Sequence, residues 1–212
     1  MIQSKKDFKY YIESDLKSLN CYPLTFKQRF SSYFCPAIWK YEVQLRKLEY
    51  RLNCKKGIIN KILFWFGFRR FERYGYKLGF TVPLNAFGPG LCLCHVGTIV
   101  INDHSKFGSN ARIHVGVNVG NYSRLDENWT PNNAPIFGDN VYLGPGAKVF
   151  GGVHIGDNVA IGANSVVNKD VPNHVTVAGV PAKEINDHGS IGLMIYGDKE
   201  KAPCSIDDNM KE

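Results

Sequence analysis

Hydrophobic and polar positions repeat every six residues between Phe137 and Val171. The first position of each six is large and apolar: Phe137, Leu143, Val149, Ile155, Ile161 and Val167. The fifth position is small or β-branched: Val141, Ala147, Val153, Val159, Ser165 and Val171. A period of six fits neither an α-helix nor a single β-strand. It is typical of a solenoid, in which each repeat buries its apolar face only against its neighbours.

The period also predicts the shape of the solenoid. Three sixes make one triangular coil, with the first positions pointing into the prism and the small fifth positions fitting the corners. Gly, Asp and Asn lie between these positions, and Gly and Asn adopt turn conformations at low cost. Successive coils then stack at the usual inter-strand spacing of about 4.8 Å. We therefore predict a mainly β fold, a parallel β-helix.

The solenoid is expected to cover residues 79–185. Upstream, sixes in the same phase begin with HVGTIV at His95 and continue to VGNYSR at Val119. Residues 125–136 (LDENWTPNNAPI) break the pattern, and this polar segment with its two prolines predicts a loop that leaves the prism. Such loops often help to shape a binding site. The polar tail, residues 186–212, is predicted to be flexible.

Residues 1–78 have a different character, and we expect a helical region there. They contain 17 Lys and Arg against 6 Asp and Glu, so the net charge of +7 belongs to this region and not to the solenoid. Residues 41–53 carry apolar side chains near helical spacing and predict a helix. Residues 1–40 are rich in aromatic and basic side chains, and Pro23 and Pro36 are expected to divide them into short segments.

Residues 55–74 mix Ile, Leu, Trp and Phe with Lys and Arg. One interpretation is an interfacial helix on an anionic membrane. The other is a helix whose apolar face packs on a partner helix or on the end of the solenoid. Nucleic-acid binding is disfavoured because no recognised binding fold accompanies the charge. The charged N-terminus and the lack of a long apolar run predict a cytoplasmic protein, with peripheral membrane contact through 55–74 left open.

Six cysteines occur, at positions 21, 35, 54, 92, 94 and 204. Cys92-Leu-Cys94 has the form of a zinc or redox motif, but nothing nearby completes it. We interpret both residues as small residues of a strand, expect the thiols to be reduced, and expect no metal.

Three segments in a fixed order carry a family resemblance: LCHVGTIV, APIFGDNVYLGPGAKVFGG and VTVAGVPAK. Across residues 78–185 they resemble the serine acetyltransferase branch of the hexapeptide-repeat acyltransferases, in particular short members encoded with surface-polysaccharide genes. The resemblance implies a left-handed parallel β-helix and direct transfer of an acetyl group from acetyl-CoA to a hydroxyl. It also implies a homotrimer with sites between subunits, and in this branch trimers often pair through the helical region.

The resemblance places the catalytic general base at His95, and a side chain with a near-neutral pKa suits that role. Three departures concern the acceptor side. Cys94 stands where serine-specific members have Asp, Ala134 replaces a second histidine, and residues 80–82 contain no acid. Asp103 matches a family glutamate and is the candidate to orient the imidazole; the alternative is a simple turn residue.

The donor side matches the family more closely. The resemblance implies that small residues let the pantetheine arm approach the backbone, and that a lysine meets the phosphates of CoA. The matching positions are Gly120, Gly144, Ala160, Gly162, Ala163 and Lys183. The glycines are also good turn residues, and Lys183 has the alternative of an ordinary surface lysine.

These observations predict an O-acetyltransferase that acts on a small-molecule acceptor with a free hydroxyl. The departures favour a sugar in surface-polysaccharide biosynthesis, with serine O-acetylation in cysteine biosynthesis as the alternative. A non-catalytic trimeric scaffold is the competing class. A metal-dependent hydratase on the same fold is disfavoured, because the histidines lack the ligand spacing of that family.

Overall fold

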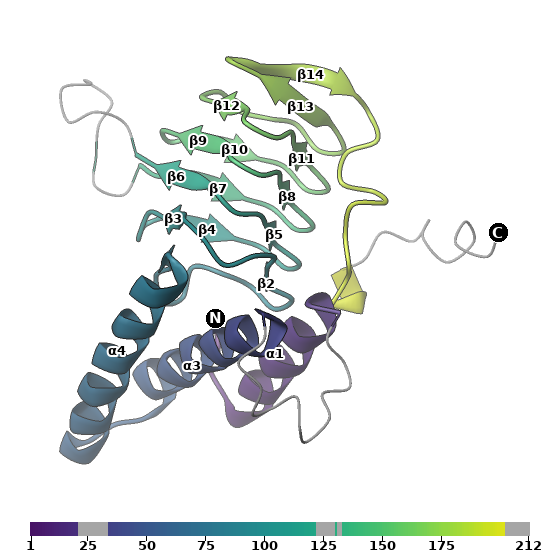
Figure 1. Cartoon of the computed structure of the whole chain (residues 1–212). Helices are drawn as coiled ribbons and strands as arrows, with labels where there is room; N and C mark the ends of the chain where they lie inside the picture. The colour runs from purple at the N-terminus through teal and green to yellow at the C-terminus, as the bar shows by residue number, and fades with distance from the viewer. Residues whose placement is uncertain (21–33, 122–129, 131–132, 202–212) are drawn as a thin grey trace.

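The computed structural model describes residues 1–20, 34–121, 130 and 133–201. Short parallel strands stack into a three-sided prism, and three helices lie across one end of it (Figure 1). The chain folds as a left-handed parallel β-helix with an N-terminal helical region, as the sequence predicted.

The helices are α1 (Lys5–Ser18), α3 (Phe34–Cys54) and α4 (Ile58–Leu78). The first face of the prism holds β1 (Phe80–Thr81), β3 (Ile99–Ile101), β6 (Asn118–Gly120), β9 (Lys148–Phe150) and β12 (Val166–Val167). The second face holds β4 (Lys106–Phe107), β7 (Ile136–Phe137) and β10 (His154–Ile155). The third face holds β2 (Cys92–Leu93), β5 (Arg112–Ile113), β8 (Tyr142–Leu143), β11 (Ala160–Ile161), β13 (Thr176–Gly179) and the antiparallel β14 (Ala182–Asn186).

The strand register measures the coil length. Tyr142 pairs with Ala160 and Lys148 with Val166, so one coil is three sixes long, as the period requires. Lys106 pairs with Ile136, so this coil is longer by two further sixes, and the extra residues fall between β6 and β7 in the sequence. The predicted loop at 125–136 falls in this interval, but its last residue, Ile136, belongs to β7. Residues 122–129 and 131–132 lie outside the described part of the chain.

The inward positions predicted from the period form the core. The first positions of the six repeats are at most 3% exposed, and the fifth positions at most 7%. Corner asparagines adopt left-handed backbone conformations, with φ of 59° at Asn140 and 57° at Asn158. Their side-chain amides form a ladder in which Asn110 donates to Asn140 at 2.8 Å and Asn140 to Asn158 at 2.9 Å. The prediction for the corner residues is confirmed.

The open end of the prism is covered by a buried charge network centred on Arg46. Its guanidinium contacts the carboxylates of Asp15 at 2.7 Å and Glu49 at 3.0 Å. It also donates to the carbonyl oxygens of Phe87 at 2.9 Å and Gly88 at 2.7 Å in the first coil. Arg46 is fully buried, so these contacts are shielded from water.

Helical carboxylates accept hydrogen bonds from the backbone of the same coil. Asp15 accepts from the amides of Gly90 and Leu91, both at 2.9 Å. Glu42 accepts from the amide of Leu93 at 3.1 Å, and burial raises the pKa of this carboxyl well above its usual value. An unpaired sheet edge exposes amides that can pair with another chain. Here the helices provide the missing acceptors and end the stack.

The helical region is longer and more regular than the sequence indicated. Residues 5–18 form α1, which was not predicted, and α3 begins at Phe34 and not near residue 41. Pro36 was expected to break the chain, but it lies in the first turn of α3. Proline is tolerated there, because the first amides of a helix have no partner within the helix.

The chain beyond Asn186 is not without structure, and this corrects the prediction for 186–201. Residues 187–201 return along the prism towards α1 (Figure 1). Asp198 and Asn110 exchange two hydrogen bonds, at 2.8 and 2.9 Å, and the hydroxyl of Tyr10 donates to the Asp198 carboxylate at 2.6 Å. The Ser190 hydroxyl donates to the carbonyl of Asn140 at 2.6 Å. Residues 202–212 lie outside the described part.

One interpretation of residues 55–74 was a helix whose apolar face packs on a partner helix or on the end of the solenoid. Only part of α4 packs in this way. Phe64 and Phe68 pack against the core, and Phe71 lies within it. Ile58, Ile59, Ile62, Leu63, Trp65 and Phe66 remain exposed on the same helix. In the described part of the chain, no helix combines the length and the apolar character needed to cross a membrane.

Candidate active site

A column of outward positions runs along the third face of the prism, one from each coil. Its members are Cys94, His114, Gly144, Gly162, Ala178 and Lys183. The amides of the first four donate to the next coil at 2.8–3.1 Å, which sets their alignment. Ala178 pairs with Lys183 across the final antiparallel hairpin. At about 4.8 Å per strand the column is about 24 Å long.

The column changes from polar side chains to bare backbone. A Cβ on Gly144 would lie 2.8 Å from the carbonyl oxygen of Ile161, and one on Gly162 would lie 3.0 Å from the Cβ of Ala178. Because the next coil approaches so closely, neither position has room for a side chain. The face between the histidine end and the exposed Lys183 is therefore a shelf without side chains at these two positions, in which Gly144 itself is buried. A narrow linear ligand can lie against such a shelf.

The structure brings most of the predicted donor-side residues to this face. Ala160 lies buried in β11, and the exposed Ala163 follows Gly162 at the corner. Gly120 is the exception. It ends β6 on the first face, where a Cβ would meet the ring of Phe150 at 2.7 Å. Within one chain, Gly120 therefore lies off the shelf.

His95 lies at the corner after β2 and is exposed. The six that was predicted to begin at His95 does not keep the phase of the later repeats. Leu93 is the inward residue, since it pairs with Ile113 and is 0% exposed. The corner between Leu93 and Ile101 is two positions longer than a regular six, which lets His95 project outwards.

The rings that follow His95 along this face, those of His114 and Tyr142, were missed from the sequence. The ring centroids of His95 and His114 are 5.8 Å apart, and those of His114 and Tyr142 are 5.1 Å apart. His114 Nε2 is buried without a hydrogen-bond partner in the described part of the chain. A regular coil of three sixes would have placed Arg112 beside Cys94, but the longer first corner shifts the register by two residues and places His114 there.

The two thiols of the first coil lie beside these rings. Cys92 Sγ and Cys94 Sγ are 3.7 Å apart, and Arg112 Nη1 lies 3.8 Å from Cys92 Sγ. A hydrogen bond from Cys92, together with one from His114 and the charge of Arg112, lowers the pKa of Cys94 to about 5. Cys92 lies in β2, as expected, and Cys94 directly follows this strand. The lowered pKa predicts that Cys94, the sequence neighbour of His95, is a thiolate at neutral pH.

Alkylation tests this charge. We measure the rate at which Cys94 reacts with iodoacetamide as a function of pH. The pH midpoint of this rate should lie well below the usual thiol pKa of about 8.5. The Cys92→Ala variant removes the main hydrogen-bond donor, so the midpoint for Cys94 should rise. Peptide-resolved mass spectrometry follows each cysteine, and Cys54 provides the internal reference. An unchanged midpoint in the variant would refute the assigned role of Cys92.

Asp103 is placed away from His95 within one chain. It is exposed and lies at the corner after β3, whereas His95 lies before that strand. Its carboxylate is 3.7 Å from His104 Nε2. In the described part of the chain Asp103 and His95 lie at different corners of the prism, so the orienting role of Asp103 stays a prediction.

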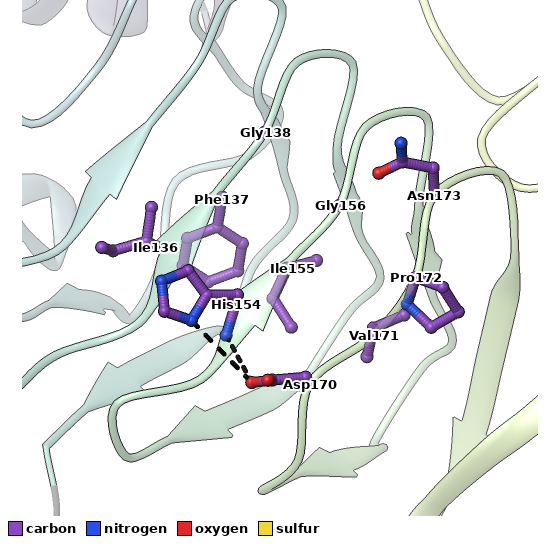
Figure 2. Close-up of a pocket in the computed structure, with 10 residues that line it drawn as sticks. All are labelled: Ile136, Phe137, Gly138, His154, Ile155, Gly156, Asp170, Val171, Pro172 and Asn173. Atoms are coloured by element: carbon purple, nitrogen blue, oxygen red, sulfur yellow. Dashed lines mark hydrogen bonds and ion pairs between the residues drawn. The ribbon is translucent and has the colours of Figure 1, made fainter.

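A separate hollow lies on the second face, at the end of the sheet formed by β4, β7 and β10 (Figure 2). It has a volume of about 520 Å³, and Ile136, Phe137, Ile155 and Val171 give it an apolar floor. His154 lies at its rim, where its Nδ1 is 4.0 Å from Asp170. Residues predicted for catalysis or CoA binding do not line it. Over the described ranges, no three His, Cys, Asp or Glu side chains converge as a metal site.

The fold is the one that the resemblance to hexapeptide-repeat transferases implied, and comparisons with known proteins support that resemblance. Residues 134–169 match the family model "Bacterial transferase hexapeptide (six repeats)". Serine acetyltransferase of Staphylococcus xylosus is 36% identical over 131 residues, covering 61% of this chain and 58% of that protein. The Synechococcus elongatus serine acetyltransferase is 36% identical over 107 residues, covering 50% and 42%.

Among solved structures, serine acetyltransferase of Neisseria gonorrhoeae aligns with a TM-score of 0.61 at 29% identity, covering 87% of this chain and 67% of that one. The comparisons support the family prediction: residues 134–169 match the hexapeptide-repeat transferase model, and the similarities to known proteins support the serine acetyltransferase branch. The chain spans about half the length of the curated relatives that it matches.

Proposed function

We propose that this protein is an acetyl-CoA-dependent O-acetyltransferase. The observation that carries the proposal is the placement of His95, an exposed imidazole at the start of a glycine shelf that ends at Lys183. This arrangement offers a general base at one end and a cation for phosphate at the other. The similarity to serine acetyltransferases supports the same chemistry.

In the proposed reaction, His95 removes the proton of the acceptor hydroxyl as its oxygen attacks the thioester carbonyl of acetyl-CoA. The tetrahedral intermediate collapses by breaking the carbon–sulfur bond, and the imidazolium returns the proton to the departing thiolate. The products are an acetyl ester and free CoA. The negative charge of Cys94 next to His95 favours the imidazolium that forms during proton transfer, which is the role a carboxylate has in related dyads and triads.

The shelf suggests how the donor binds. The pantetheine arm lies along the column at Gly144 and Gly162, where no side chains project, and Lys183 meets the phosphates. Ala163 keeps the neighbouring surface small, whereas Ala160 is buried in β11. Gly120 and Asp103 contribute only if a second subunit brings them to the shelf, so we propose a homotrimer with sites between subunits. The use of acetyl-CoA is consistent with a cytoplasmic location.

For the acceptor, the comparisons favour L-serine over the sugar hydroxyl that the sequence suggested, because the matching relatives are named serine acetyltransferases. One observation keeps the sugar as a second candidate. Cys94 replaces an expected acid, Ala134 replaces the second histidine and is 3% exposed, and the buried Phe80 stands where another acid is expected. Serine has a charged amino group and a charged carboxylate that its binding site must pair, whereas a neutral sugar has neither. The loss of these polar residues therefore matters less for a sugar acceptor.

An acceptor assay decides between the two. Purified full-length protein is given acetyl-CoA with L-serine or with a panel of nucleotide-linked and free sugars, and free thiol is measured. We expect L-serine to give turnover well above the hydrolysis background. Turnover with a sugar and not with serine would support the second candidate. Binding of acetyl-CoA without transfer to any acceptor would contradict the proposed enzyme and favour a scaffold.

A further inference from the structure

The distal half of α4 presents an apolar surface that the described part of the chain does not cover. Ile58 is 69% exposed, Ile59 73% and Phe66 62%, and Ile62, Leu63 and Trp65 are about half exposed. We call these six residues the tip. Positions 59, 62, 63 and 66 have the spacing of one helical stripe. Because α4 points away from the prism, the tip lies at the end of the helix that is remote from the strands (Figure 1).

Cations surround the tip and continue from it. Lys55, Lys56 and Lys61 flank it, all exposed, and the guanidinium of Arg69 lies 5.5 Å from the ring of Trp65. A groove of about 1410 Å³ then runs between α1, α3 and α4, and Leu63 of the tip lines it. Seven of its described lining residues are Lys or Arg and none is Asp or Glu: one from α1, three from α3 and three from α4.

The fold makes this surface more basic than the composition suggests. Three of the six acids in residues 1–78, Asp15, Glu42 and Glu49, are buried around Arg46 beneath the prism. The other three are Asp7, Glu13 and Glu72, and Glu13 is paired with Lys17 at 2.8 Å. The outer surface of the helices therefore carries most of the lysines and arginines with little compensating charge.

We propose that the tip and the basic groove together dock on an anionic phospholipid surface. The aliphatic and aromatic side chains of the tip enter the boundary between headgroups and acyl chains, and the cations of the groove contact the phosphates. A nucleic acid would match the cations but would leave Ile58, Ile59 and Ile62 without apolar partners. A second copy in a symmetric contact would oppose one basic groove to another, which like-charge repulsion disfavours.

A vesicle flotation experiment tests the proposal with the full chain. We expect binding to phosphatidylcholine vesicles that contain about a third phosphatidylglycerol, and little binding to phosphatidylcholine alone. Raising the salt from about 0.1 M to about 0.5 M should weaken binding, because the charges are exposed. Brominated lipids should quench tryptophan fluorescence, and this quenching should decrease in Trp65→Phe.

Two variants separate the contributions of the tip and the groove. Trp65→Ser with Phe66→Ser removes exposed apolar surface, and Arg70→Glu with Arg73→Glu reverses charge in the groove. Each should lower vesicle affinity at least about tenfold and leave the melting temperature nearly unchanged. The matched controls are Tyr76→Ser, an exposed aromatic of α4 outside the tip, and Lys169→Glu on the prism. Both controls should bind like the unmodified protein.

Binding that ignores phosphatidylglycerol, or that persists in both double variants, would overturn the proposal. A second pair of results would also overturn it: the unmodified protein fails to bind vesicles, and its oligomer dissociates in the Trp65→Ser, Phe66→Ser variant. The tip would then be a contact between copies of the chain. Flotation needs no acetyl-CoA or acceptor. A failure of the proposed acetyl transfer is therefore distinguishable from a failure of membrane docking.

Discussion

His95→Ala is expected to lower acetyl transfer by about 10²–10⁴-fold, the usual contribution of a general base. The expected loss is in turnover, because the imidazole acts on the proton of the acceptor and the shelf that binds acetyl-CoA stays intact. The rate of thiol release under saturating acetyl-CoA measures the effect. The affinity for CoA, measured by calorimetry, should change little.

The structure provides a matched control for this variant. His154 is also an exposed histidine after a corner of the prism, but it lies on the second face beside Asp170 (Figure 2). His154→Ala should retain activity. Since His95 is exposed, its replacement should leave the thermal unfolding midpoint close to that of the unmodified protein. Near-normal turnover in His95→Ala would remove this residue from the mechanism and the main support from the proposed function.

Arg46→Met is expected to destabilise the fold by about 3–5 kcal/mol, the typical cost of removing one partner of a buried ion pair. The substitution keeps most of the side-chain volume but leaves Asp15 and Glu49 buried without their cation. It also leaves the carbonyl oxygens of Phe87 and Gly88 without their donor. The free energy of unfolding from denaturant titration, at one fixed protein concentration, measures the cost.

Arg69→Met is the comparison, because Arg69 is exposed and its described contact is with the ring of Trp65. Exposed substitutions of this kind usually change stability by less than about 0.5 kcal/mol. A cost below about 1 kcal/mol for Arg46→Met, far under the usual cost for a buried pair, would show that the network does not hold the helices to the first coil. The carboxylates and carbonyl oxygens that Arg46 contacted would then be hydrogen-bonded to water or to other donors.

The solenoid was readable from the sequence because its contacts repeat at a constant separation. Each inward residue, such as Leu143 or Ile161, packs against the equivalent residue one coil away, so the period alone identifies the core. The same rule fails where the spacing changes. The corner that holds His95 is two positions longer than a six, so the phase of the repeats breaks at His95 and the proximity of His114 was not predicted.

The candidate site was predictable only as a set of separate positions. The resemblance named His95, Gly144, Gly162 and Lys183, and the structure puts the three shelf positions in one column that begins beside His95. The resemblance did not name Tyr142, nor Cys94 as a charged neighbour of His95. Tyr142 and Cys94 are brought to the same face by β2, β5 and β8, which pair across coils that are longer than the regular three sixes. No local sequence pattern indicates how much longer these coils are.

What the amino-acid sequence determined by itself is the prism: its period, its inward residues and its corner asparagines, since each depends on neighbours at a fixed distance along the chain. Tertiary structure alone decided how the prism ends. The buried acids of the helices close the first coil around Arg46, and the tail returns so that Asp198 meets Tyr10 from the other end of the chain. These contacts join segments that share no repeat, and their energy comes from burying specific polar partners together, which a periodic pattern does not encode.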